Sequence, residues 1–254
     1  MNQRTAVRPS PVFLGLLIVT AFGAWLSLRG GSDTALRVGV FILVAGGWIV
    51  SLCLHEFGHA FLAWRNGDHS AAERGYLTLN PLKYSNAALS FVLPVLFVLL
   101  GGIGLPGGAV YVDRGAIPGR LRHSLISAAG PAANIVFALV LAALIPDSPS
   151  DSTIYFWSGV GFLTFLQVTA ALLNLVPFPG LDGYGIVEPY LPESWRRGAV
   201  KVAPYGLLIV IAILWIPTVN RAFFSAITRL TDLMGVSPLL VGFGDQLFRF
   251  WTGG

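Results

Sequence analysis

The sequence is short of charged residues. Asp, Glu, Lys and Arg together make up 11% of its 254 residues, whereas hydrophobic residue types make up 55%. A soluble globular domain carries about 25% charged residues, and a chain this poor in charge would expose more apolar surface than water can solvate. The composition therefore excludes an ordinary soluble enzyme and indicates that lipid surrounds most of the chain.

Cysteine is nearly absent as well. Cys53 is the single cysteine, so the chain forms no internal disulfide and its fold gives no sign of an oxidising compartment. The net charge is +4, and the basic residues flank apolar runs, as they do in the cytoplasmic loops of membrane proteins. This distribution argues against nucleic acid as a partner and favours a lipid bilayer.

Six long stretches contain no charged residue. A membrane-spanning helix needs about 20 predominantly apolar residues, and five of the six stretches can supply one, the second by extending past its last apolar residue. The stretches are residues 11–28, 38–54, 84–112, 123–146, 152–181 and 202–220. The first follows two arginines, as in a signal peptide, but it is long and has no convincing cleavage site, so we interpret it as a retained span.

The fold class follows from these runs. We predict an all-α polytopic membrane protein with five to six transmembrane helices in a single integral-membrane domain that covers residues 1–254. Its catalytic core is expected at about residues 38–190 and its C-terminal helices at 200–254. Residues 222–251 have a mixed pattern, which could form an amphipathic surface helix, a final span, or both.

Two further segments do not fit a simple span. Residues 87–105 are apolar, but Pro94 and several glycines interrupt them. Residues 65–83 form the longest polar stretch, and within it residues 75–79 alternate weakly between polar and apolar. This alternation allows a short β-strand after the second span.

The strongest chemical signal is His55-Glu56-Phe57-Gly58-His59. Residues four apart lie on one face of a helix, so His55 and His59 can present two imidazoles to one metal ion. Glu56 lies beside them and can accept a proton from water at that metal. The alternative is a pair of histidines that only form hydrogen bonds inside a helix bundle, but ionisable groups within a span are costly and usually functional.

A catalytic zinc site needs a third protein ligand and keeps a further position for water or substrate. The candidates are Asp68, His69, Glu73, His123 and Asp182. The first three lie in the polar stretch and are interpreted as solvated loop residues, and His123 as an interfacial residue at a helix entrance. Asp182 follows an apolar span among prolines and glycines that unwind the helix end, where a buried carboxylate is costly unless a metal neutralises it. From spacing alone, a metal ligand and a surface-turn aspartate are equally good interpretations of Asp182.

Two asparagines also lie in apolar surroundings. Asn134 ends the segment Ala129-Gly130-Pro131-Ala132-Ala133-Asn134, whose small residues allow close helix packing in lipid. An unpaired amide is costly there, so Asn134 either links two helices or points into the active site. Asn174 carries the same two interpretations.

The motifs together resemble the site-2 protease family of intramembrane zinc metalloproteases. They occur in the family's order, as His55-Glu56-Phe57-Gly58-His59, then Gly130-Pro131-Ala132-Ala133-Asn134, then Asn174 with Leu181-Asp182-Gly183. The resemblance implies a zinc metalloendopeptidase that cleaves a transmembrane protein or peptide substrate. No segment is long enough for a PDZ or CBS module, so the chain resembles a minimal member.

The resemblance also implies roles for individual residues. Asp182 would be the third ligand of one catalytic zinc ion, beside His55 and His59, with Glu56 as the catalytic base. Asn174 would stabilise the oxyanion or position the scissile peptide, and Asn134 would be a structural or substrate-positioning residue.

The charges of the loops predict an orientation. Residues 146–152 contain two Asp and no basic residue, so they are expected outside, whereas residues 105–122 and 184–201 each contain three basic residues and are expected inside. The metal site would then lie toward the cytoplasmic side. Both flanks of residues 87–105 would be cytoplasmic, so this segment is predicted to be re-entrant or to lie along the membrane.

Two other functions remain open at this stage. One is a transporter or channel whose ion pathway uses the same histidines and aspartate, although no pair of segments repeats an inverted pattern. The other is a catalytically inactive zinc-binding membrane protein.

Overall fold

The computed structural model describes residues 7–84 and 110–252. Within these ranges the chain is helical and contains no β-strand. The helices are α1 (Pro11–Arg29), α2 (Asp33–Arg65), α3 (Ser70–Glu73), α5 (Arg120–Leu144), α6 (Ile154–Asn174), α7 (Asp182–Val187), α8 (Glu193–Val202), α9 (Gly206–Leu214), α10 (Pro217–Leu233) and α11 (Pro238–Phe248). Short 3-10 turns connect several of them.

Five helical stretches in the described part are long and apolar enough to cross a membrane. They are α1, α2, α5, α6 and the continuous stretch Glu193–Leu214, which contains α8 and α9. A sixth span results if α10 and α11, which bend by 113° at their junction, count as one. The predicted all-α fold with five to six spans is therefore confirmed, and the chain is a multi-pass membrane protein.

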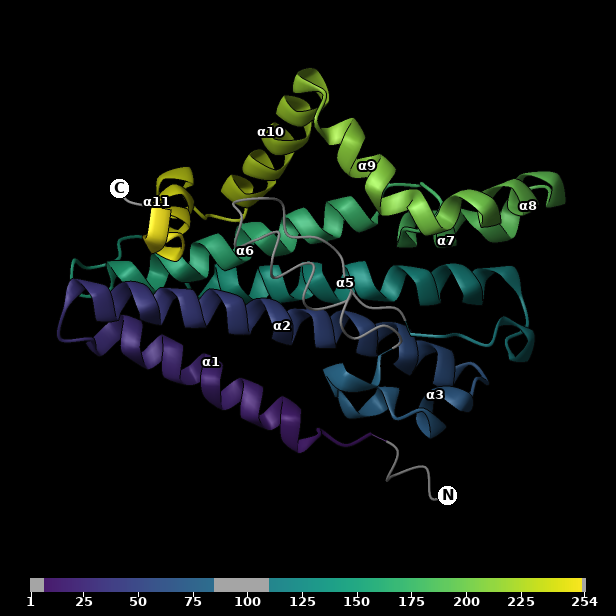
Figure 1. Ribbon diagram of the computed structural model, residues 1–254, viewed down its shortest axis with the longest axis horizontal. Coiled ribbons are helices and arrows are strands. Elements are labelled where there is room, and N and C mark those ends of the chain that lie inside the picture. Colours follow the sequence, from purple (N-terminus) through teal and green to yellow (C-terminus); the bar gives the residue numbers. More distant parts are fainter. Residues whose placement is uncertain (1–6, 85–109, 253–254) are drawn as a thin grey trace.

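The centre of the molecule is formed by α2, α5 and α6, which run side by side, with α1 packed along the outer side of α2 (Figure 1). Glycines bring α1 and α2 into close contact. A Cβ on Gly23 would lie 2.5 Å from the backbone nitrogen of Leu43, and a Cβ on Gly39 would lie 2.3 Å from that of Ser27. Small residues serve this purpose in lipid, where helix association depends on close packing.

The chain reverses direction where its sequence favours helix ends. Ser10 caps α1 by accepting a hydrogen bond from the Phe13 amide at 3.1 Å, and Ser32 caps α2 in the same way. After α2, Gly67 adopts a φ of +118°, which favours glycine. Pro177 and Pro179 lie between α6 and α7, where they prevent the helix from continuing.

The C-terminal helices do not continue the central layer. In Figure 1, α9 and α10 lean away from α6 and meet at the turn before Pro217, whereas α11 returns to the end of the layer opposite α7. A Cβ on Gly244 would lie 2.0 Å from the carbonyl oxygen of Ser158, so α11 packs tightly on α6. Leu247 and Phe248 are fully buried in the core with Trp48.

The sequence allowed a short strand at residues 75–79 and predicted a re-entrant segment at residues 87–105. Residues 76–78 form a 3-10 turn and not a strand, because Gly75 and Leu79 on either side adopt left-handed backbone conformations. The predicted re-entrant segment 87–105 lies outside the described residues. The division of residues 1–254 into a catalytic core and C-terminal helices stays a prediction.

Candidate metal centre

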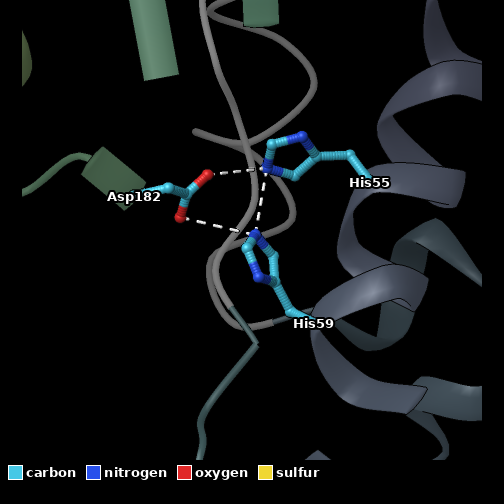
Figure 2. A group of neighbouring side chains, drawn as sticks. All are labelled: His55, His59 and Asp182. Atoms are coloured by element: carbon cyan, nitrogen blue, oxygen red, sulfur yellow. Dashed lines mark hydrogen bonds and ion pairs between the residues drawn. The ribbon is translucent and has the colours of Figure 1, made fainter. Parts of the chain in front are cut away.

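Three predicted ligands converge in the structure. His55 and His59 lie one turn apart on α2, and Asp182 is the first residue of α7 (Figure 2). His55 Nε2 lies 3.1 Å from one carboxylate oxygen of Asp182, and His59 Nε2 lies 3.4 Å from the other. The two Nε2 atoms are 3.2 Å apart. These residues form the one group in the described part of the chain whose His, Cys, Asp or Glu atoms are close enough to hold a metal ion.

The spacing fits a zinc ion. Zinc takes nitrogen and oxygen ligands at about 2.0–2.1 Å in tetrahedral geometry, which places neighbouring ligand atoms about 3.3 Å apart. The separation of 3.2 Å between the two Nε2 atoms matches this value, and each of them lies at a similar distance, 3.1 or 3.4 Å, from one of the two oxygens of the Asp182 carboxylate. Oδ2 of Asp182 is also buried without a hydrogen bond in the described residues, and a cation would satisfy it.

The outer nitrogens of both imidazoles are held by α5. His59 Nδ1 lies 2.7 Å from the carbonyl oxygen of Ile126, and His55 Nδ1 lies 2.6 Å from Oδ1 of Asn134. A carbonyl oxygen only accepts, so Nδ1 of His59 donates and its Nε2 keeps a lone pair for the metal. Such bonds orient metal-ligating histidines and select the tautomer.

A chain of polar side chains continues inward from Asn134. Nδ2 of Asn134 donates to Oε1 of Gln167 on α6 at 2.8 Å, and Nε2 of Gln167 donates to Oγ of Ser51 on α2 at 3.0 Å. Oγ of Ser51 donates to the carbonyl oxygen of Trp48. All three central helices are therefore joined through His55 by buried polar groups whose hydrogen bonds are made.

Gly130 leaves the space in which the ligands meet. A Cβ at this position would lie 2.2 Å from Nε2 of His59 and 2.4 Å from Nε2 of His55. A side chain there would occupy the place of a metal ion. A glycine at position 130 is thus required by the site.

Asp182 is placed by the backbone between α6 and α7. A Cβ on Gly183 would lie 2.2 Å from the carbonyl oxygen of Leu175, so this turn packs directly on the end of α6. Burial raises the pKa of the Asp182 carboxyl, but the facing imidazoles of His59 and His55, when they are protonated in the metal-free site, lower it by more, so the net pKa lies below its ordinary range. The carboxylate is ionised, as a metal ligand must be.

Glu56 is buried on α2 next to His55. One of its carboxylate oxygens, Oε2, accepts a hydrogen bond from the backbone amide of Val110 at 3.0 Å. This bond fixes one oxygen of the carboxylate and leaves the other without a hydrogen bond in the described residues. Asn174 is also buried, and its side chain makes no hydrogen bond within the described ranges.

The other candidate ligands do not join the group. His69 and Glu73 are exposed, as expected for loop residues, and His123 is half-buried on the first turn of α5. The prediction for Asp68 was wrong, because this residue is 1% exposed and not solvated. Residues from a distant part of the chain cover it.

Sequence reasoning missed Gln167, Ser51 and the role of Gly130. Gln167 carried a signal, because an amide in the middle of an apolar span needs a partner. Ser51 carried none that distinguished it from the other small residues of α2, and Gly130 was noted only as part of a small-residue motif that allows close helix packing. As for Asn134, the structure places it against His55, while its role toward substrate stays a prediction.

Comparison with known proteins identifies relatives of nearly the same length. Neither a family model nor a solved structure matches the chain. A protein named "Putative zinc metalloprotease Rip2" from Mycolicibacterium smegmatis is 52% identical, over 98% of this chain and 96% of the relative. Its namesake from Mycobacterium tuberculosis is 49% identical, over 99% of this chain and 97% of the relative.

A more distant relative matches about two thirds of the chain. "Putative zinc metalloprotease YwhC" from Bacillus subtilis is 30% identical over 176 residues, which are 66% of this chain and 78% of the relative. The chain therefore belongs to the family of zinc metalloproteases that includes these proteins, and its His55, His59 and Asp182 lie close enough to bind the metal ion.

Proposed function

We propose that the chain is an intramembrane zinc endopeptidase of the site-2 protease type, which hydrolyses a peptide bond within or near a transmembrane segment of a membrane protein. One observation carries the proposal. The three ligands and Glu56 meet among helices that are long and apolar enough to span a membrane, and both histidines are less than a tenth exposed. A protease with its chemistry at this place acts on substrates that enter from the bilayer.

Different residues of the chain have different roles in peptide hydrolysis. His55, His59 and Asp182 would hold zinc, which when bound supplies a Lewis acid that polarises a carbonyl and acidifies water. Glu56 accepts the proton from the attacking water and can pass it to the leaving amine. The Val110 amide holds Oε2 of Glu56, so Oε1 remains for this transfer.

Asn174 is the candidate for orienting the scissile peptide. Its amide is buried at the end of α6 and makes no hydrogen bond within residues 7–84 and 110–252, so it is available to a substrate carbonyl. A buried amide donor directed at a developing oxyanion contributes strongly to acyl-transfer catalysis. The substrate helix must unwind locally, because its carbonyls are otherwise engaged in helical hydrogen bonds.

Water reaches such a site from a membrane surface. A cavity of about 310 Å³ lies beside Asp182 and is lined by Arg114, Ser127, Tyr184 and Arg196, among others. Basic residues are numerous at the end of the bundle that contains this cavity, which favours the cytoplasm for that end. We therefore infer that the active site faces the cytoplasmic side.

The proposal is tested with purified protein in lipid nanodiscs and a candidate single-span membrane substrate. Wild-type protein is compared with wild-type protein treated with a zinc chelator and with Glu56→Gln. Cleavage should stop with the chelator, return when zinc is added back, and fall by about 10²–10⁴-fold in Glu56→Gln, which removes the base.

Two controls make the test decisive. Glu73→Gln alters an exposed glutamate outside the site and should cleave like the wild type. A soluble peptide with the same cleavage sequence separates an intramembrane enzyme from a general peptidase. Cleavage that persists in both chelator and Glu56→Gln would refute the proposal.

A further inference from the structure

Asp68 is the least exposed carboxylate in the described part of the chain, at 1%. Its Oδ1 accepts from the Ser70 amide at 3.0 Å and from the Ser70 hydroxyl at 2.6 Å. Its Oδ2 accepts from the backbone amide of Asp113 at 2.8 Å. Burying a carboxylate is costly unless its oxygens are hydrogen-bonded. Two of these three donors belong to Ser70, two residues after Asp68, and the third belongs to Asp113, 45 residues after it.

The bond to Asp113 fixes one end of a short segment without regular secondary structure, residues 110–113. The other end of this segment is Val110, whose amide donates to Oε2 of Glu56 at 3.0 Å. Asp68 itself is tied to α2, because its backbone amide donates to the carbonyl oxygen of Ala63 at 3.0 Å. The segment is therefore held against α2 by two hydrogen bonds, one to the carboxylate of Glu56 and one to the carboxylate of Asp68.

The dimensions of the two elements agree. Glu56 and Ala63 are seven residues apart on α2, which corresponds to about 10 Å along the helix axis. Three residue steps, from Val110 to Asp113, can span up to about 10 Å. The segment thus lies along the last turns of α2, with Asp68 at one end and Glu56 at the other.

The side chains of the segment alternate between the protein and its surroundings. Val110 packs against the cluster that contains Cys53 and Ala60, and Val112 packs against the cluster that contains Ala63. Tyr111 points outward and is 53% exposed. Apolar contacts of this kind hold the segment on α2 but permit sliding, whereas the hydrogen bond to Asp68 sets its position along the helix.

We propose that Asp68 is a positioning residue for Glu56. It anchors the segment 110–113 so that the Val110 amide orients the carboxylate of Glu56, which lies twelve residues earlier in the chain. The role rests on the proposed function of Glu56 as the base. Asp68 itself touches neither the metal ligands nor a reacting group.

Two variants separate positioning from local stability. Asp68→Asn keeps the shape of the side chain but has one acceptor oxygen in place of two. The amide and hydroxyl of Ser70 are both donors to that oxygen, so the new NH2 group faces the Asp113 amide and the bond to Asp113 is lost. Ser70→Ala removes the hydroxyl bond to Oδ1 and leaves the Asp113 bond to Oδ2 in place. Both variants and the wild type are prepared in the same detergent, and zinc content is measured first.

The first measurement is hydrogen–deuterium exchange of the Val110 and Asp113 amides. In Asp68→Asn both amides should exchange about tenfold faster or more, because a hydrogen bond to a charged group is lost at one end and the other end is released. In Ser70→Ala both should remain within about twofold of the wild type. Unchanged exchange of Val110 in Asp68→Asn would overturn the inference, even if Asp113 exchanges faster.

The second measurement is cleavage kinetics. Asp68→Asn should lower kcat by about tenfold or more with a smaller change in KM, since a base displaced by a fraction of an ångström loses much of its effect. Zinc content should equal that of the wild type. Equal losses of kcat in Asp68→Asn and Ser70→Ala, or a loss of zinc in Asp68→Asn, would contradict positioning.

A negative result in each of the two measurements counts against a different claim. Exchange needs no substrate, so it tests the link from Asp68 to Val110 whether or not the chain is a protease. A wild-type protein that cleaves no substrate would count against the proposed function, and unchanged exchange of Val110 would count against the inference.

Discussion

α1 and α6 are similarly apolar and differently placed. The most apolar window of α1 has a mean hydropathy of 2.0 and is 17% buried, whereas that of α6 has a mean hydropathy of 1.6 and is 78% buried. α6 contains the buried polar residues Thr164, Gln167 and Asn174. Hydropathy therefore identifies both helices as spans but does not distinguish the lipid-facing helix from the central one.

The polar residues make that distinction for a physical reason. Lipid offers no hydrogen bonds, so an amide or imidazole within a span must find its partner on another helix. Gln167 finds Asn134 and Ser51, and through Asn134 it supports His55. The interior of this protein lies where such partners meet, and the metal centre is part of the same network. The predictions that follow test this contrast, and three of them compare a central residue with a residue of the same type elsewhere in the chain.

The largest effect is expected from Gly130→Ala. The new methyl group would lie 2.2 Å from Nε2 of His59, in the space shared by the ligands. Zinc affinity should fall by about a hundredfold or more, beyond the effect of losing a supporting hydrogen bond. Gly15→Ala on α1 is the control, because a Cβ there has no atom within 4 Å. Titration with a competing chelator measures both, and equal zinc affinities in the two variants would contradict the geometry of the site.

A smaller effect is expected from Asn134→Ala. His55 would lose the acceptor for its Nδ1 proton, and loss of such a partner lowers metal affinity by about 10–100-fold. Asn66→Ala is a matched control, because the Asn66 amide donates to the carbonyl oxygen of Leu62 at the end of α2. The same chelator titration should leave Asn66→Ala unchanged. An unaffected Asn134→Ala would mean that Asn134 does not hold the ligand.

Gln167→Leu acts one hydrogen bond further from the metal. It leaves Nδ2 of Asn134 and Oγ of Ser51 without their partner, which should destabilise the fold by about 1–3 kcal/mol. Zinc affinity should change less than in Asn134→Ala. Equilibrium unfolding of the zinc-free protein in mixed micelles measures the first effect, and an unfolding free energy equal to that of the wild type would show that the network does not support the core.

The smallest effect is expected for a hydrogen bond within a single helix that occurs in both α1 and α6. Thr164 on α6 and Thr20 on α1 each donate to the carbonyl oxygen four residues earlier, at 2.9 and 2.8 Å. That carbonyl already belongs to a helical turn, so Thr→Val at either position should change the unfolding free energy by about 0.6 kcal/mol or less. A large loss for Thr164→Val alone would mean that burial, and not the partner, determines the strength of the bond.

The sequence predicted those parts of the molecule that depend on local periodicity. The spans follow from apolar runs, and the convergence of His55 and His59 follows from their separation by one helical turn. Asp182 was ambiguous from spacing, and the family resemblance selected it. The structure then placed it 3.1 Å from Nε2 of His55.

The remaining features depend on contacts that local patterns do not contain. Asp68 was interpreted as solvated because its neighbours in the sequence are polar, yet it is buried and accepts a hydrogen bond from the amide of Asp113, 45 residues later. The 3-10 turn at residues 76–78 replaced a possible strand because no second strand among the described residues pairs with it. The space next to Gly130 is visible only when α5 is packed on α2.

The central claim is that one zinc ion is held by two imidazoles and one carboxylate. Zinc K-edge X-ray absorption of the purified protein tests it most directly. We predict one zinc per chain with nitrogen and oxygen ligands at about 2.0–2.1 Å and the scattering pattern of two imidazoles, which is lost in Asp182→Ala and His59→Ala. A sulfur ligand at about 2.3 Å, which only Cys53 or a methionine could supply, or a spectrum unchanged in Asp182→Ala, would contradict the account.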